Sequence, residues 1–360
     1  MFFTCLILGP FNPKVGIDFF LEPLINDLKK LWTGVLTCDI SRKQNFMMRA
    51  MLMWIINDFP AYGMLSGWGI HGKLACLHCM EHTKAFRLYH GGENSWFDSH
   101  RRFLPNDYAF RRNKNAFKKG EVDMDVPPPK LTPIEVWNRV KGYPKVTESG
   151  VQKIDGYGEW HNWTKRSIFW DLPYWKDNLL RHNLDVMYIE KNFFDIFNTV
   201  MNVSGKTKDN EKAQMDLSLY CRRKDLELKC HSNGKMYMPK ANYTLSLDQI
   251  KQVCHWLKDL RMPDGYSSNL SRCADINRGK VIGMKSHDCH VFMECLLPIA
   301  FSSLPTHVLN PITEVSHFFK DLCCTTVMEQ NFPIILCKLE RIFPPSFFDS
   351  VEHLPIHLAY

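Results

Sequence analysis

The chain has 360 residues and a net charge of +7 at pH 7, from 45 Lys and Arg against 38 Asp and Glu. Hydrophobic residues make up 45% of it, which excludes an intrinsically disordered chain and suffices for two or three globular domains. No apolar run reaches the roughly 18 residues of a membrane span, and 13 cysteines without a signal peptide predict reduced thiols.

The first 60 residues alternate between strand and helix patterns. Residues 2–8 read as a buried strand, and residues 17–32 carry apolar side chains at helical spacing. Residues 35–38 predict a short strand, whereas residues 44–56 are apolar enough for either a helix or a buried strand. Such alternation is typical of an α/β layer.

The rest of the chain predicts polar loops and then helices. Proline-rich residues 120–134 and glycine-rich residues 142–158 read as loops, and residues 167–201 have a helical pattern. Ser246 is placed to cap a helix over residues 247–260. Residues 288–303, 311–330 and 332–343 also read as helices, so the second half is predicted to be mainly α-helical.

Two motifs near residue 60 are candidates for metal binding. Asp58 follows the apolar run, where a carboxylate can hold Mg²⁺ or Mn²⁺, although an Asp near a proline is also a common turn residue. Cys76 and Cys79 form a CxxC pair, which is half of a tetrahedral zinc site. Two buried free thiols are the alternative. Candidates for the missing ligands are His71, His78, His82, His100 and His182.

Basic and aromatic residues alternate between positions 100 and 119. Basic side chains grip phosphates while aromatic rings stack on bases, so this stretch predicts contact with DNA. A solvated charged face is the alternative. The residues concerned are Arg101, Arg102, Arg111, Arg112, Lys114, Lys118 and Lys119.

Two later segments also concentrate polar groups. His182, Asp185 and Glu190 lie close together in sequence, with an ordinary charged helix as the alternative to a site. Residues 286–290, SHDCH, look like a metal or nucleophile cluster, but an Asp at a predicted helix start is ordinarily a capping residue.

With these residues laid out, the chain resembles the transposases of plant CACTA (En/Spm-type) DNA transposons. The resemblance covers nearly the whole chain and rests on several motifs in the same order. The matching segments include LILGPFNPKVGIDFFLEPLINDLKKLW, KQNFMMRAMLMWIINDFPAYGMLSGW, GKLACLHC, HRRFLP, LPYWKDNLLRHNLDVMYIEKN, GKTKD, PDGYSSNLSR, KSHDCH and LERIFPPSFFDSVEHLPIHL.

The resemblance implies an α/β, RNase H-like core with DD[E/D] nuclease chemistry that uses Mg²⁺ or Mn²⁺. Asp58 matches the second catalytic acid of the family, and the third acid is expected at Glu190, with Asp209 as second choice. Cys76, Cys79 and His182 match expected zinc ligands. The implied partners are transposon-end DNA and a second copy of the chain, in the nucleus, without membrane or small-molecule substrate.

Two departures from the family pattern bear on activity. The first catalytic Asp of the family lies upstream of the segment with which this chain begins, and Tyr188 stands where the family has a second His. We therefore expect an N-terminally truncated and catalytically incomplete transposase-derived protein. A DNA- or protein-binding module that reuses the fold without catalysis is the alternative, and an expressed remnant without a role is a third.

The expected architecture has two parts. Residues 1–215 are predicted to form an incomplete RNase H-like core, with a basic and proline-rich insertion at about 100–165. Residues 216–360 are predicted to form a mainly α-helical domain that belongs to the transposase-associated domain of unknown function.

Overall fold

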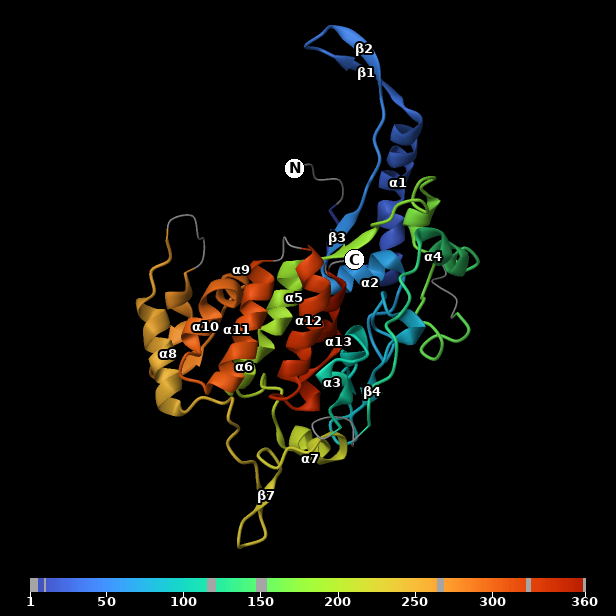
Figure 1. The fold of residues 1–360 in the computed structure, drawn as a ribbon. Helices are drawn as coiled ribbons and strands as arrows, with labels where there is room; N and C mark the ends of the chain where they lie inside the picture. Colours follow the sequence, from blue (N-terminus) through green and yellow to red (C-terminus); the bar gives the residue numbers. More distant parts are fainter. Residues whose placement is uncertain are drawn as a thin grey trace. The chain divides into compact units, whose positions relative to one another are not determined.

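The computed structural model describes residues 6–9, 11–114, 121–146, 154–263, 269–321 and 325–358. It is a mixed α/β chain that divides into two compact units (Figure 1). Unit 1 comprises residues 1–83 and 128–185, and unit 2 comprises residues 84–127 and 186–359. This division differs from the expected boundary near residue 215, because the 84–127 segment folds with the C-terminal half of the chain.

Unit 1 holds the helices and strands that carry the first motifs. Its helices are α1 (Ile17–Thr33), α2 (Phe59–Ser66) and α4 (Pro133–Val140). Its strands are β1 (Val35–Asp39), β2 (Gln44–Met48), β3 (Ile55–Asn57) and β6 (His182–Leu184). Its 3-10 turns are η1 (Lys14–Gly16), η2 (Met80–His82) and η5 (Ile168–Asp171).

Unit 2 is mainly helical. Its main helices are α5 (Val186–Phe193), α6 (Asp195–Val200), α7 (Glu211–Tyr220), α8 (Leu247–Asp259), α11 (Thr306–Lys320) and α12 (Thr325–Leu339). Shorter helical elements are η3 (Arg101–Phe103), α3 (Ala109–Arg112), η6 (Leu270–Cys273), α9 (Ser286–Val291), η7 (Phe292–Leu296), α10 (Leu297–Ala300), η8 (Pro345–Phe347), α13 (Ser350–His353) and η9 (Leu354–His357). Its strands are β4 (Phe86–Arg87), β5 (Asn94–Ser95), β7 (Lys229–Cys230), β8 (Met236–Tyr237), β9 (Ala274–Asp275) and β10 (Lys280–Val281).

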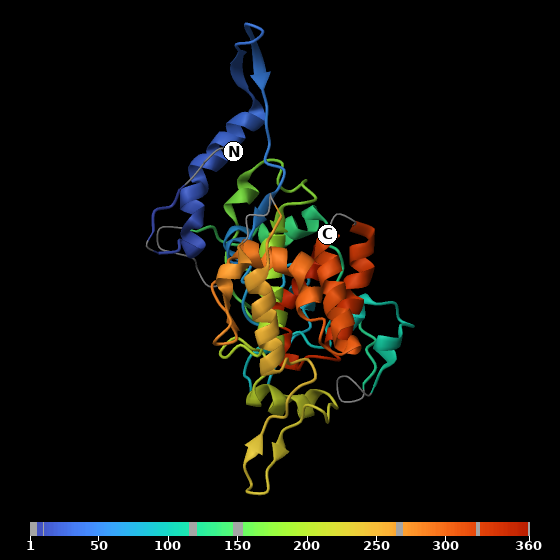
Figure 2. The same ribbon diagram turned by 90° about the vertical axis from the view of Figure 1, so that its left-hand side faces the viewer.

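The strands of the described residues form five two-stranded sheets. Four are antiparallel hairpins, and β1 and β2 form the longest of them, which projects beyond the end of α1 in both views (Figures 1 and 2). The exception is the pair β3 and β6, which is parallel and joins segments more than 120 residues apart. The sequence predicts either a helix or a buried strand for residues 44–56. The structure has two strands there, β2 and the first residues of β3, joined by residues 49–54 without regular secondary structure.

Several predicted helices are confirmed and others are shorter than expected. The helix over 17–32 is α1, and Ser246 caps α8 by accepting a hydrogen bond from the Gln249 N–H. The helical reading of 167–201 was too long, because His182–Leu184 pairs with β3 as a strand. Residues 6–8 are not a strand, and the rest of the predicted 2–8 strand lies outside the described residues.

Each unit has an aromatic core. In unit 1 the buried tryptophans Trp68, Trp163, Trp170 and Trp175 pack with Ile25 of α1. In unit 2 phenylalanine rings from α5, α6, α11, α12 and η7 pack edge to face. Among the described residues, no helix combines the length and the apolar character that a membrane crossing requires.

Candidate functional site

Asp58 lies at the carboxyl end of β3, in unit 1. Its Oδ1 accepts a hydrogen bond of 2.8 Å from the Ala61 N–H, so the carboxylate is the N-cap of α2. The parallel register pairs Asn57 with Leu184, and the Asp185 N–H donates to the Asn57 carbonyl at 2.7 Å. Asp58 and Asp185 therefore each follow one of two neighbouring parallel strands at the same edge.

The two residues expected as third acid both lie in unit 2. Glu190 is fully buried on α5, where its Oε2 contacts His290 Nδ1. Asp209 accepts hydrogen bonds from the Tyr243 hydroxyl at 2.7 Å and from Gln214 Nε2. Burial raises the pKa of the Asp209 carboxyl, and both hydrogen bonds oppose that rise. Both carboxylate oxygens of Asp209 are thus hydrogen-bonded within unit 2.

Cys76 and Cys79 sit on a tight turn that leads into η2, and both side chains are fully buried. The Cys79 N–H points to Cys76 Sγ at 3.4 Å, and the Met80 N–H donates to the Cys76 carbonyl at 2.9 Å. Met80 has a φ of 47°, a left-handed conformation that costs a non-glycine residue free energy. The turn thus holds the two sulfur atoms in the arrangement of a two-ligand chelate.

His182, the expected third zinc ligand, lies on β6 among aromatic rings. The rings of Trp175, Phe169 and Tyr62 meet it edge on, with centroids 5.6, 6.0 and 6.1 Å away. Burial, and then the Arg181 charge, lower the pKa of His182 to about 3. The ring is therefore neutral at physiological pH, and its assignment as a zinc ligand stays a prediction.

His353 and His357 form a second pair of candidate ligands, in unit 2. His353 ends α13 and His357 ends η9, so one helical turn separates the two buried rings. Their Nε2 atoms are 3.1 Å apart, close to the roughly 3.3 Å between two nitrogen ligands of one tetrahedral zinc ion. Asp349 fixes the start of α13 by accepting from the Val351 N–H at 2.7 Å.

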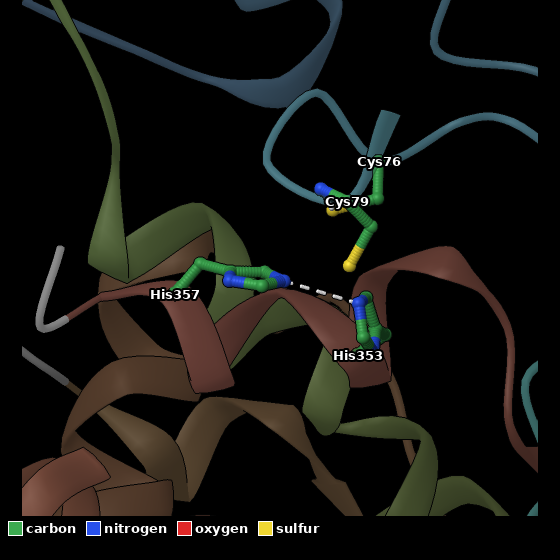
Figure 3. Close-up of side chains that lie close together, drawn as sticks. All are labelled: Cys76, Cys79, His353 and His357. Carbon is green, nitrogen blue, oxygen red and sulfur yellow. Dashed lines mark hydrogen bonds between the residues drawn. The ribbon is translucent and has the colours of Figure 1, made fainter. Parts of the chain in front are cut away.

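Figure 3 draws the two pairs, Cys76 and Cys79 of unit 1 and His353 and His357 of unit 2. Thiols and imidazoles are both common zinc ligands. The sequence interpretation named Cys76 and Cys79 but not the histidine pair, although the spacing H-x3-H is visible in the sequence.

The basic stretch is largely internal, which corrects the expectation of DNA contact for three of its arginines. Arg101, Arg102 and Arg111 are 0%, 4% and 1% exposed. Arg111 donates to backbone carbonyls, including that of Leu104 at 2.7 Å, and Arg101 Nη2 lies 3.0 Å from Asp98 Oδ1. Their guanidinium groups are therefore not available to a phosphate backbone.

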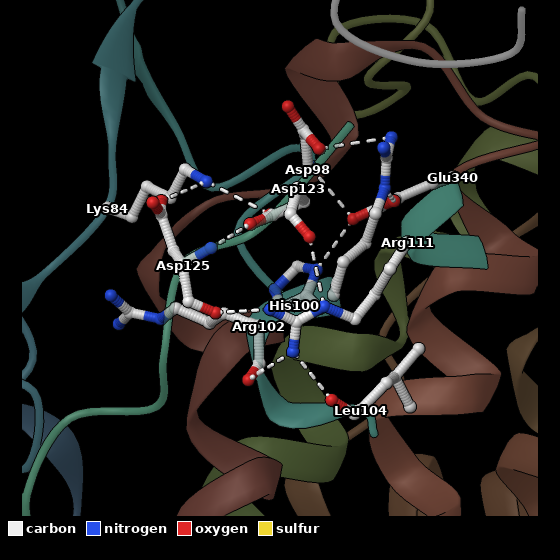
Figure 4. A network of polar contacts seen from close by, with 10 residues as sticks. Lys84, Asp98, His100, Arg102, Leu104, Arg111, Asp123, Asp125 and Glu340 are labelled. Carbon is white, nitrogen blue, oxygen red and sulfur yellow. Dashed lines mark hydrogen bonds and ion pairs between the residues drawn. The ribbon is translucent and has the colours of Figure 1, made fainter. Parts of the chain in front are cut away.

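A buried carboxylate organises this charged network (Figure 4). Glu340 Oε1 accepts from the Asp98 N–H at 2.9 Å and lies 2.8 Å from His100 Nδ1. At its outer edge Lys84 bridges Asp123 and Asp125 at 3.0 and 2.5 Å. Charges so buried stay ionised only when they are paired, so the network serves the fold of unit 2.

Of the remaining basic residues, Arg112 and Lys114 are exposed and keep the predicted ability to contact phosphates. Lys118 and Lys119 lie outside the described residues. The basic surface is thus smaller than the sequence suggested.

Comparisons with known proteins bear on the two ends of the chain. Residues 1–143 match the model of the transposase family tnp2, and residues 320–360 match a domain of unknown function (DUF4218). No curated protein and no solved structure shows a match. The second match spans α12, η8, α13 and η9, and it includes Glu340, His353 and His357. The first 143 residues of the chain are thus similar to the transposase family tnp2.

Proposed function

We propose that the protein derives from a DD[E/D] DNA transposase of the CACTA (En/Spm) type, with an RNase H-like catalytic centre in unit 1. The observation that carries this proposal is the parallel pair β3 and β6, because it brings Asp58 and Asp185 to the same edge of a sheet. Metal-dependent nucleases of this type gather their carboxylates at the ends of neighbouring strands. Activity on chromosomal DNA implies a nuclear location.

The donor set suits a hard divalent cation. Asp58 and Asp185 offer only carboxylate oxygens, which Mg²⁺ and Mn²⁺ prefer. Such an ion, when bound, supplies Lewis-acid activation of a phosphodiester and of water. The Ala61 N–H holds one oxygen of Asp58 in place and leaves the other free to face a ligand. Asp185 is therefore our candidate for a further catalytic acid within unit 1.

Metal-dependent nicking of supercoiled plasmid DNA tests this proposal. We expect Asp58→Asn and Asp185→Asn to abolish nicking, while Asp177→Asn, an exposed acid of unit 1, retains it. Asn caps a helix as well as Asp does, so Asp58→Asn removes the charge and keeps α2. Nicking that persists in both variants refutes the assignment. Salt-sensitive DNA binding without nicking by the wild-type protein supports the non-catalytic binding module.

We further propose that Cys76 and Cys79 supply two ligands to a structural zinc ion. The two thiols are buried on one tight turn of unit 1, and such a pair is half of a tetrahedral zinc site.

Zinc content by mass spectrometry of the purified protein tests this site. We expect about one zinc per chain to be lost in Cys76→Ser and in Cys79→Ser. Cys38→Ser, which removes an exposed thiol, should keep the metal. His182→Phe tests the predicted third ligand. Zinc content that is unchanged in both Cys76→Ser and Cys79→Ser would overturn the assignment.

A further inference from the structure

A third polar cluster, within unit 2, involves Glu190, His290 and Glu294. His290 stands between the two carboxylates: its Nδ1 contacts Glu190 Oε2, and its Nε2 lies 3.7 Å from Glu294 Oε2. One ligand atom from each residue lies within 4.8 Å of the other two. The three residues come from α5, α9 and η7.

The backbone around Glu294 is shaped to bring its side chain toward His290. In an α-helix, two residues four apart are offset by about 40° around the axis. Residues Phe292–Leu296 form a π-helical turn, whose wider spiral changes this offset. Its cause is in the sequence: Pro298 has no N–H to donate to the Glu294 carbonyl. That carbonyl instead accepts a hydrogen bond of 3.0 Å from Ser316 Oγ.

The cluster is half buried and half open. Glu190 is fully buried, so its carboxylate needs a positive partner to remain ionised. The side chains of His290 and Glu294 are 28% and 25% exposed, which leaves one side accessible to solvent. Asp288 plays a different role, since it accepts from the Lys285 N–H at 2.9 Å and fixes the start of α9. Glu190 thus provides a buried carboxylate, and His290 and Glu294 keep the cluster accessible to solvent.

We propose that Glu190, His290 and Glu294 bind one divalent first-row transition metal ion. One imidazole and two carboxylates suit Mn²⁺, Fe²⁺ or Zn²⁺ and leave coordination positions free for water. A π-helical turn beside these ligands fits a site, because such turns occur frequently at functional sites. This site does not depend on the proposed nuclease centre, and it gives Glu190 a role apart from Asp58.

Titration with Mn²⁺ alone, followed by the paramagnetic resonance signal of the free ion, tests the proposal on the full chain. We expect His290→Ala to bind one Mn²⁺ fewer per chain than the wild type. Glu294→Gln should weaken that site roughly tenfold or more. His317→Ala removes an exposed histidine of α11 and should change nothing.

The nuclease proposal is separable in the same titration, because Asp58→Asn should remove a different Mn²⁺ ion. If His290→Ala does not fold, Glu294→Gln decides, since it keeps the size of a partly exposed side chain. Unchanged Mn²⁺ stoichiometry and affinity in Glu294→Gln would overturn the metal site. His290 would then serve only to contact the two carboxylates within unit 2.

Discussion

Replacing Lys165 with methionine should destabilise unit 1 strongly. The Lys165 side chain is fully buried, and its Nζ donates to Asp18 Oδ1 at 2.5 Å and to the Val15 carbonyl at 3.0 Å. Burial raises the pKa of the Asp18 carboxyl and lowers the pKa of the Lys165 amine, and the mutual attraction only partly opposes both shifts. The pair is therefore electrostatically costly and depends on both members.

The magnitude follows from what the substitution leaves behind. Lys165→Met strands a carboxylate that is 6% exposed, and removal of one member of a buried pair costs about 3–5 kcal/mol. Replacing both partners, as in Asp18→Leu with Lys165→Met, should recover most of that loss, because apolar pairs of similar volume are often neutral or stabilising.

Urea unfolding followed by tryptophan fluorescence measures this effect, since the tryptophan core of unit 1 adjoins the pair. With m-values of about 1–3 kcal/mol/M, the midpoint should fall by more than about 1 M. The exposed pair of Lys30 and Asp27 is the control, and Lys30→Met should leave the midpoint nearly unchanged. A double variant as unstable as Lys165→Met alone would refute the reasoning.

The same variant has a predicted pH dependence. A carboxyl whose pKa is raised by folding stabilises the fold below its unfolded pKa, and this contribution is lost as pH rises through the folded pKa. Asp18 is such a group. The deficit of Lys165→Met relative to the wild type should therefore shrink below about pH 4, where Asp18 is protonated in both states.

Three further predictions follow from single positions. Gly67→Ala should destabilise unit 1 by about 1–3 kcal/mol or more in urea unfolding, because φ is 84° and the new Cβ would meet the Lys165 carbonyl oxygen at 2.5 Å. Glu340→Ala should cost about 3–5 kcal/mol and speed proteolysis of unit 2, because it removes the acid that contacts the buried His100 and one of the two acids that face Arg101. Neutralising Arg112 and Lys114 together should lower the slope of log DNA affinity against log salt by about 2 while leaving the melting temperature unchanged.

Local signals in the sequence predicted local structure. The apolar spacing of residues 17–32 and the Ser246 cap correspond to α1 and α8, since both depend on neighbours within one or two turns. The strand character of residues 182–184 was missed, because it arises from pairing with β3, a segment more than 120 residues earlier. The position of Asp58 after an apolar run made it a candidate catalytic acid, which stays a prediction, and the structure shows the carboxylate as the N-cap of α2.

The charged residues show why their burial could not be predicted from the sequence. A run of arginines looks the same in sequence whether it faces water or a buried carboxylate. Arg101 is internal because Asp98 and Glu340 surround it, and Glu340 lies more than 230 residues later in the chain. By contrast, the H-x3-H spacing of His353 and His357 is local and visible in the sequence.

The two regions that match family models do not correspond to the two folding units. Segment 84–127 belongs to unit 2 and hydrogen-bonds to the region that matches the domain of unknown function. Ser95 Oγ donates to the Pro345 carbonyl at 2.6 Å, and the Trp96 N–H donates to the Phe348 carbonyl at 2.8 Å. Glu340 likewise contacts His100 and Arg101, which lie in the region that matches tnp2. Part of the tnp2 match, residues 84–127, therefore folds in the same compact unit as the C-terminal match.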